Sequence, residues 1–267
     1  MKRILVWILF LSVYFSLFIN CSLSMAAPLI WVTDDTPGGR FINGGGPDFH
    51  SEKPGIEIEL YRMVARRLDL DIELRRMSWN TCLHLIEQNR VDAIFPASFK
   101  PERMKIGVYP MKDGAVDAGR KTRDNAYYLY TLKNSALDWD GARFTRGDTP
   151  AVIGLPEGWA IVDFVVKRYD NVVEEPVNRK LPNLLVHGRL QGFICLETVF
   201  DAYLKKGDGI YEDIVKVHPP VWEKPYYLML SHRFVTGNPA LAEGIWNAIR
   251  EIKQTPAYAD MVSRYVE

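Results

Sequence analysis

Hydrophobic positions in the first half of the chain alternate between two spacings, and this alternation predicts an α/β protein. Residues 29–33 form a short apolar run typical of a strand, and residues 56–68 carry apolar side chains on one side at helical spacing. Residues 71–77 alternate as a strand, residues 80–88 are helical, and residues 91–97 are strand-like again. Strand, helix, strand, helix and strand in this order indicate a parallel sheet with covering helices.

The second half repeats this rhythm without a fixed repeat length. The expected strands there are residues 126–132, 151–155, 171–174, 190–196, 214–217 and 226–231. The expected helices are residues 159–168, 181–186, 197–205, 238–254 and a last one that opens at Pro256.

The N-terminal 26 residues have the three-part pattern of a secretory signal peptide. Lys2 and Arg3 are followed by an almost wholly apolar run over residues 4–19 and then by the small residues Ser24 and Ala26. We therefore expect cleavage after Ala26 and a periplasmic mature protein. An uncleaved N-terminal anchor is the alternative, although the apolar run is shorter than the roughly 20 residues of a membrane span.

Composition narrows the class of the mature chain. Over the full sequence of 267 residues, hydrophobic residues make up 48%, charged residues 25%, and the net charge is +0. This is typical of a globular protein and lacks the positive charge of nucleic-acid binders, so no nucleic-acid partner is expected. Cys82 and Cys195 are expected to be buried free thiols, with a disulfide as the weaker alternative. The histidines are scattered without paired spacing, and the Gly-rich residues 38–46 do not form a phosphate loop, so neither a metal nor a cofactor is expected.

Three stretches, in this order and spacing, resemble the family 3 extracytoplasmic solute-binding proteins, the substrate-binding components of polar amino-acid ABC transporters. They are residues 55–60 (GIEIEL) with 67–70 (RLDL), residues 91–98 (VDAIFPAS) with 100–103 (KPER), and residues 188–194 (GRLQGFI) with Glu197. The order of predicted elements is similar along nearly the whole mature chain.

The resemblance implies an α/β fold of the type II periplasmic-binding-protein kind. Each of two lobes would have a mainly parallel sheet with helices on both faces, and two hinge strands would join the lobes. Lobe one would comprise residues 27–126 and 230–267, and lobe two residues 127–229. A ligand would bind in the cleft between the lobes, which would close by a hinge motion.

Arg103 is the first candidate for binding the ligand. The resemblance implies that this arginine holds the ligand's carboxylate from lobe one, and a guanidinium presents a planar fork that suits both carboxylate oxygens. A surface arginine paired to Glu102 or Asp92 is the alternative. Ser98 matches a hydroxyl that would help to hold the same carboxylate, but a serine there also suits a turn.

Glu197 is the candidate in lobe two, where an acidic residue of amino-acid receptors binds the ligand's ammonium group. The usual residue there is Asp, and a helix-start carboxylate is the alternative. Trp159 replaces a Ser or Thr whose hydroxyl would meet the carboxylate, and it either stacks on the ligand or packs under a helix. Phe41 and Trp79 are the further aromatic candidates for the cleft wall. The pair Asp34-Asp35 is expected in a solvated loop or at a solvated strand end.

These observations predict a monomeric periplasmic receptor, not an enzyme, that captures a small amino-acid-like or carboxylate-bearing ligand for an ABC permease of the inner membrane. A ligand-sensing accessory protein for a membrane sensor is one alternative. An enzyme on the same scaffold, resembling the cyclohexadienyl dehydratases, is the other.

Overall fold

The computed structural model describes residues 27–147, 151–205 and 209–265. The predicted signal peptide and its Cys21 therefore lie outside the described residues. Within the described ranges, no helix combines the length and the hydropathy that a membrane crossing needs.

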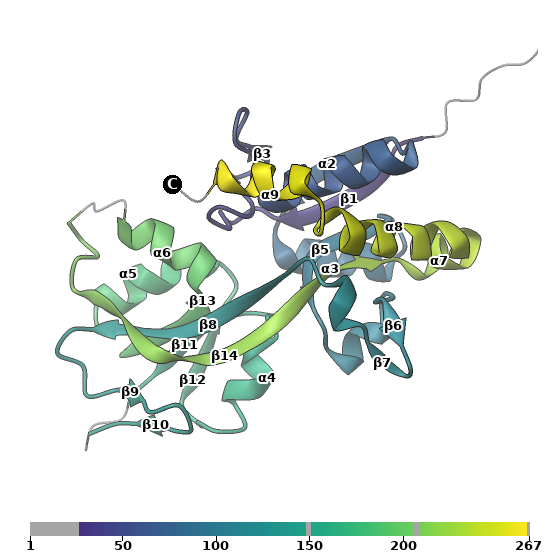
Figure 1. Ribbon diagram of the computed structural model, residues 1–267. Coiled ribbons are helices and arrows are strands. Elements are labelled where there is room, and N and C mark those ends of the chain that lie inside the picture. The colour runs from purple at the N-terminus through teal and green to yellow at the C-terminus, as the bar shows by residue number, and fades with distance from the viewer. Residues whose placement is uncertain (1–26, 148–150, 206–208, 266–267) are drawn as a thin grey trace, which may run out of the picture.

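An eight-stranded sheet extends through the whole described molecule, in the order β12-β11-β13-β8-β14-β5-β1-β4 (Figure 1). We call the part built on β1, β4 and β5 lobe one and the part built on β11, β12 and β13 lobe two. The strands of this sheet are β1 (Leu29–Asp34), β4 (Ile72–Met77), β5 (Ala93–Ser98), β8 (Arg123–Leu132), β11 (Ile153–Pro156), β12 (Val172–Glu175), β13 (Gly192–Leu196) and β14 (Ile214–Leu230). Short two-residue pairs add β2 (Gly44–Gly45) with β3 (Asp48–Phe49), β6 (Met111–Lys112) with β7 (Ala115–Val116), and β9 (Asp138–Trp139) with β10 (Phe144–Thr145).

Helices pack on the sheet in both lobes (Figure 1). Those of lobe one are α2 (Ile56–Leu68), α3 (Trp79–Glu87), α7 (His232–Gly237), α8 (Pro239–Ile252) and α9 (Pro256–Ser263). Those of lobe two are α4 (Ile161–Val165), α5 (Leu181–Val186) and α6 (Glu197–Lys205). Three short 3₁₀ turns are η1 (Pro101–Lys105), η2 (Ala118–Arg120) and η3 (Asn178–Lys180). The α/β class and the type II architecture predicted from the sequence are confirmed.

The strands β8 and β14 pass between the lobes side by side (Figure 1). β8 pairs with β13 of lobe two, and the far end of β14 pairs with β5 of lobe one. The sheets of the two lobes are therefore continuous, where separate sheets were expected. The predicted lobe boundaries at residues 126/127 and 229/230 fall on these two strands.

β14 is one long strand where the sequence predicts two. Its pairing with β8 is interrupted between Val217 and Trp222, and Pro219 and Pro220 lie in that interval. Proline has no backbone N–H to donate to a neighbouring strand, so a break in the hydrophobic pattern there marks an irregularity in the strand and not its end.

Local capping explains where several helices begin. The hydroxyl of Ser78 accepts a hydrogen bond from the Thr81 N–H at 3.3 Å and so caps the start of α3. α4 is shorter than its predicted range because hydrogen bonds to the third preceding residue tighten both of its ends, as between Val162 N–H and the Trp159 carbonyl at 3.2 Å. α7 was not predicted, and its cap is Ser231, whose hydroxyl accepts from Phe234 N–H at 3.1 Å.

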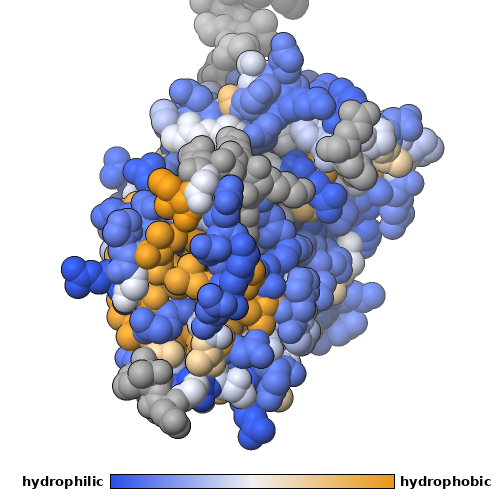
Figure 2. Space-filling view, turned by 90° about the vertical axis from the view of Figure 1, so that its left-hand side faces the viewer, coloured by the Kyte–Doolittle hydropathy of each residue, from blue (hydrophilic) through white to orange (hydrophobic). Residues whose placement is uncertain are grey.

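Two hydrophobic clusters fill the interior. One lies in lobe one between the sheet, α2 and α8, and includes Trp31, Tyr61 and Trp246. The other extends from α3 of lobe one across to the core of lobe two. Cys82 and Cys195 are buried free thiols, as predicted. Hydrophobic residues also reach the surface at the end of lobe two, where Figure 2 shows a patch of them framed by hydrophilic residues.

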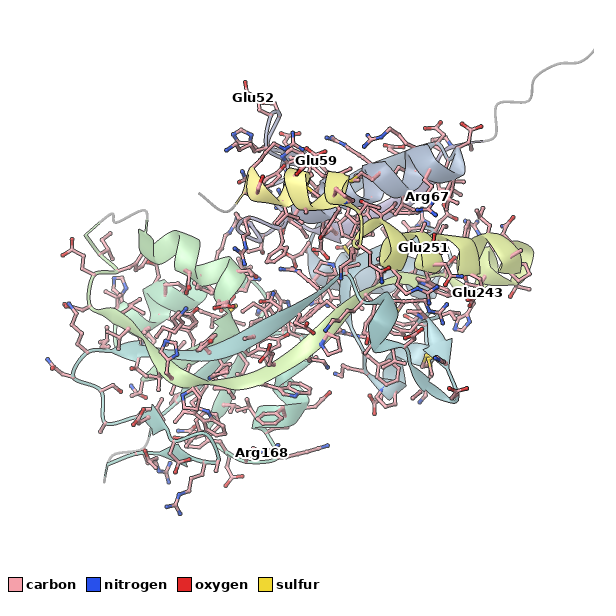
Figure 3. The ribbon with its side chains drawn as sticks, viewed as in Figure 1. Glu52, Glu59, Arg67, Arg168, Glu243 and Glu251 are labelled. Atoms are coloured by element: carbon pink, nitrogen blue, oxygen red, sulfur yellow. The ribbon has the colours of Figure 1, made fainter. Side chains whose placement is uncertain are left out.

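Charged side chains cover the outside of lobe one. Arg67 of α2 pairs with Glu251 of α8, and both side chains lie on the outer surface of the helices (Figure 3). Such an exposed pair contributes little to stability, about 0–1 kcal/mol, so the two helices are held together mainly by the buried cluster beneath them.

Candidate functional site

Two cavities lie between the lobes and share part of their walls. The first, which we call the arginine chamber, has a volume of about 50 Å³. The second, which we call the loop chamber, has a volume of about 300 Å³. Asp34, Trp79 and Trp159 line both of them. The other residues of the arginine chamber are Pro96, Ser98, Arg103, Tyr127, Ala160, Leu196 and Tyr226. The other residues of the loop chamber are Asp35, Ser78, Asn80, Pro156, Glu157, Pro176, Val177, Asn178 and Arg179.

Arg103 is buried at the arginine chamber, with 7% of its surface exposed. Pro101 opens the 3₁₀ turn η1, and this turn directs the guanidinium back to the end of β5. There Nη1 donates to the carbonyl and the hydroxyl of Ser98, at 3.0 and 3.2 Å, while Nη2 donates to the Gly158 carbonyl at 3.1 Å. These bonds use three of the five N–H groups of a guanidinium, which leaves two for a ligand.

Asp34 supplies the opposite charge. It ends β1 and is partly buried, and one carboxylate oxygen accepts from the Thr36 N–H at 2.6 Å. Burial raises the pKa of this carboxyl group from 3.8 to about 6, against the lowering effect of the bonds from Thr36. Arg76 lies nearby, but its guanidinium donates to the backbone carbonyls of Asp35 and Asp48. Among the described residues, no side-chain cation forms an ion pair with Asp34.

A further cation stands behind Arg103. Lys224 of β14 donates from Nζ to the Phe99 carbonyl at 2.8 Å. Burial lowers the pKa of this lysine to about 7, and the nearby charges of Arg103 and Lys100 lower it further. Near neutral pH Lys224 is therefore only partly charged, and Arg103 supplies the positive charge at the arginine chamber that favours an anionic group there.

The two lobes touch each other directly around the chambers. Besides the bond from Arg103 to Gly158, Lys100 of lobe one pairs with Asp163 of lobe two. The Thr36 hydroxyl donates to the side-chain oxygen of Asn178 at 3.1 Å. The structure is thus a closed arrangement of the lobes.

Four of the six residues proposed from the sequence line the arginine chamber: Arg103, Ser98, Trp79 and Trp159. Glu197, the first residue of α6, lines neither chamber. Its carboxylate lies 3.5 Å from Lys216 Nζ. Phe41 lines neither chamber either; its ring lies 4.3 Å from the guanidinium carbon of Arg123 and packs against the core of lobe one.

Three polar residues of the arginine chamber were not proposed from the sequence: Asp34, Tyr127 and Tyr226. Asp34 is at a strand end, one of the two expected places, but the expectation that its carboxylate is solvated was wrong, because the closed lobes remove it from bulk water. The place of Asp34 in the sequence could have indicated a ligand-binding role. Ligands of parallel α/β sheets bind beyond the carboxyl ends of the strands, and Asp34 is the last residue of β1. The tyrosines come from the hinge strands, whose cleft-facing positions depend on register.

The described residues include no group of three or more His, Cys, Asp or Glu side chains arranged to hold a metal ion. The two lobes, the paired hinge strands and the charged chamber between them define a solute-binding protein of the periplasmic-receptor type. The family of bacterial extracellular solute-binding proteins, family 3, matches residues 46–267, so the chain belongs to this family. No curated protein sequence matches this chain.

Solved structures with the same fold are similar along most of their length. An ancestral arginine-binding protein bound to glutamine is 17% identical, with a TM-score of 0.69 over 91% of this chain and 99% of that one. The ligand-binding core of GluR0 from Nostoc punctiforme with L-glutamate is 16% identical, with a TM-score of 0.67 over 90% and 99%. A histidine kinase sensor domain similar to periplasmic binding proteins is 12% identical, with a TM-score of 0.70 over 90% and 96%.

Proposed function

We propose that this protein is a periplasmic receptor that binds a small zwitterion in the arginine chamber and delivers it to an ABC permease. One observation carries the proposal: Arg103 and Asp34 line the same chamber with opposite charges and do not pair with each other. Buried charges are costly unless they are paired. A ligand with a carboxylate for Arg103 and a cationic group for Asp34 would neutralise both.

The size of the arginine chamber limits the ligand. A cavity of about 50 Å³ holds roughly three to five waters, at about 10–15 Å³ for each. The ligand is therefore a small solute, and one of more than about five non-hydrogen atoms would need the lobes slightly further apart than they are here. The solved relatives bound to glutamine and to glutamate support an amino-acid-like ligand class, although their sequences are too distant to carry over the ligand itself.

The proposed role is binding and release without bond chemistry. Lobe contacts around the chamber, such as Lys100 with Asp163, would form on closing and break on opening. Turnover of a cyclohexadienyl substrate by the purified protein would instead support the enzyme alternative.

A sensory role is the second candidate function. The similarity to a histidine kinase sensor domain supports it, because that neighbour has the same fold as part of a kinase sensor. A permease and a sensor protein would both recognise the closed, ligand-bound conformation. Pull-down of the closed, ligand-bound protein with either membrane partner distinguishes the two roles.

A thermal-shift panel tests the proposal. The probes are small zwitterions (glycine, L-alanine, glycine betaine), small anions (acetate, propionate) and small cations (methylammonium, tetramethylammonium). We expect at least one zwitterion to raise the melting temperature, because a ligand that binds only the folded state stabilises it. Single-charge probes should shift it less.

Arg103→Ala should weaken binding of the active zwitterion by about 2–5 kcal/mol, which is roughly 30-fold or more, the range for truncating one partner of a buried charge pair. Arg168→Ala is the matched control, because Arg168 lies on the exposed outer side of lobe two (Figure 3). A panel in which no zwitterion stabilises the protein, or an Arg103→Ala variant with unchanged affinity, would refute the proposal.

A further inference from the structure

The arginine chamber is walled by aromatic rings on several sides. They belong to Trp79 of lobe one, Trp159 of lobe two, and Tyr127 and Tyr226 of the hinge strands. The rings of Tyr127 and Trp159 meet edge to face, with centroids 6.3 Å apart. The guanidinium carbon of Arg103 already lies 5.5 Å from the ring centroid of Trp79, so this wall accepts a cation.

Hydrogen-bond acceptors for a primary ammonium group are scarce in the same chamber. Such a group has three N–H donors to satisfy. The Ser98 carbonyl accepts from Arg103 Nη1 at 3.0 Å and from the Tyr109 hydroxyl at 2.9 Å, which occupies both of its lone pairs. The Tyr127 hydroxyl accepts from the Tyr226 hydroxyl at 2.8 Å. The Ser98 carbonyl is thus committed to the protein itself, and the acceptors that remain are the two tyrosine hydroxyl oxygens and the Asp34 carboxylate.

The acidic residue expected to bind an α-ammonium group lies elsewhere. Glu197 is outside both chambers, 3.5 Å from Lys216, whose hydrogen bond goes to Asp201. Of the described residues that line the arginine chamber, Asp34 alone is acidic. The chamber therefore offers a cation one carboxylate and four aromatic rings.

We propose that the ligand's cationic end is an N-methylated, preferably quaternary, ammonium group held by Asp34 and the four aromatic rings, so that the ligand is a small betaine. A quaternary ammonium has no N–H to satisfy, and its methyl groups present spread positive charge to the ring faces. Its carboxylate pairs with Arg103, so this inference rests on the proposed function and adds the class of ligand.

The test is calorimetric titration of the full chain with four ligands that share one carboxylate: glycine, N-methylglycine, N,N-dimethylglycine and glycine betaine. We expect the dissociation constant to fall with added methyl groups, to at least tenfold below that of glycine for glycine betaine. The isostere 3,3-dimethylbutyrate keeps the carboxylate and the shape of glycine betaine, but a neutral tert-butyl group replaces the positively charged trimethylammonium group. It should bind at least tenfold more weakly than glycine betaine.

Variants separate the role of the rings from mere packing. Trp159→Leu should remove most of the preference for glycine betaine over glycine, while Trp159→Phe, which keeps an aromatic face, should retain part of it. Each variant's melting temperature without ligand shows whether it is folded. If Trp159→Leu is unfolded, the same comparison is made with Trp79→Leu and Trp79→Phe.

The outcomes distinguish this inference from the proposed function. If glycine or L-alanine binds as tightly as glycine betaine and depends on Arg103, the proposed function stands and the methyl-ammonium inference is wrong. If 3,3-dimethylbutyrate matches glycine betaine, shape and not charge is recognised, and the inference is again wrong. If no zwitterion of the series binds, the inference is wrong, and if L-alanine and the other zwitterions of the thermal-shift panel do not bind either, the proposed function fails as well.

Discussion

Replacing Asp34 by Asn should make the ligand-free protein more stable. The pKa of this carboxyl group rises from 3.8 to about 6 because burial opposes its ionisation. At about 1.36 kcal/mol for each unit of pH, that difference amounts to about 3 kcal/mol of unfolding free energy at neutral pH. The amide is never ionised, and its oxygen can still accept from the Thr36 N–H, so Asp34→Asn should recover up to this amount.

The dependence on pH identifies the cause. Between the two pKa values the folded protein holds a proton that the unfolded chain has released, so the Asp34 contribution to stability falls as pH rises from about 4 to about 6. The gain from Asp34→Asn should therefore be about 3 kcal/mol at about pH 7.5 and about 1 kcal/mol at about pH 4.5. For a chain of this size the larger value corresponds to a melting temperature higher by about 6–12 °C.

Urea unfolding without ligand, at both pH values, measures these differences. Asp170→Asn is the matched control, because Asp170 is exposed on lobe two and its replacement should change stability little at either pH. The same Asp34→Asn variant should bind glycine betaine at least tenfold more weakly, because the ligand's positive charge loses its partner. A variant no more stable than the wild type at about pH 7.5, or a gain that does not shrink in acid, would refute the reasoning.

Two further substitutions test the hinge and the closed state. Glu57→Gln should lower the free energy of unfolding, measured in urea, by about 3–5 kcal/mol. The substitution removes the counter-charge of the buried Arg123 guanidinium, which lies 3.2 Å from the Glu57 carboxylate. A loss below about 1 kcal/mol would contradict this reasoning. Gly158→Ala should weaken ligand binding and enlarge the radius of gyration measured by small-angle scattering. The added Cβ would lie 2.7 Å from the side-chain oxygen of Asn80 in the other lobe, and the φ of +71° at this position is unfavourable for alanine. The double variant with Asn80→Ala should recover part of the closure. A Gly158→Ala protein that is as compact as the wild type and binds ligand equally well would show that closure does not depend on the close approach of residues 158 and 80.

The elements with a strong hydrophobic period were predictable from the sequence. α2, α5 and α6 have the predicted ends, because each carries a clear apolar face and begins or ends at a local signal. The continuity of β14 was not predictable, since strand pairing depends on partners far away in the sequence and Pro219 resembles a stop.

The site was predictable where a local motif fixes the chemistry. Arg103 and Ser98 belong to one turn, so their proximity follows from five residues of sequence. The surroundings of Asp34 and Glu197 could not be predicted, because they are a tertiary property. Closing the lobes buries Asp34, while Lys216 of β14, which donates to Asp201, lies 3.5 Å from the Glu197 carboxylate.

Residues 157–159 of lobe two connect ligand binding to lobe closure. The resemblance to amino-acid receptors implies a hydroxyl here that would contact the ligand's carboxylate, but this chain has Trp159. The Gly158 carbonyl instead accepts a hydrogen bond from Arg103, and Trp159 lines the arginine chamber. Lobe one would then hold both charged ends of the ligand, through Arg103 and Asp34, and lobe two would contribute an apolar face and a backbone acceptor. Lobe two thus contacts Arg103 directly. The part of the free energy of closure that the ligand contributes must therefore come from the burial of Asp34 and of the aromatic rings. A ligand that fits Arg103 alone would bind without favouring closure.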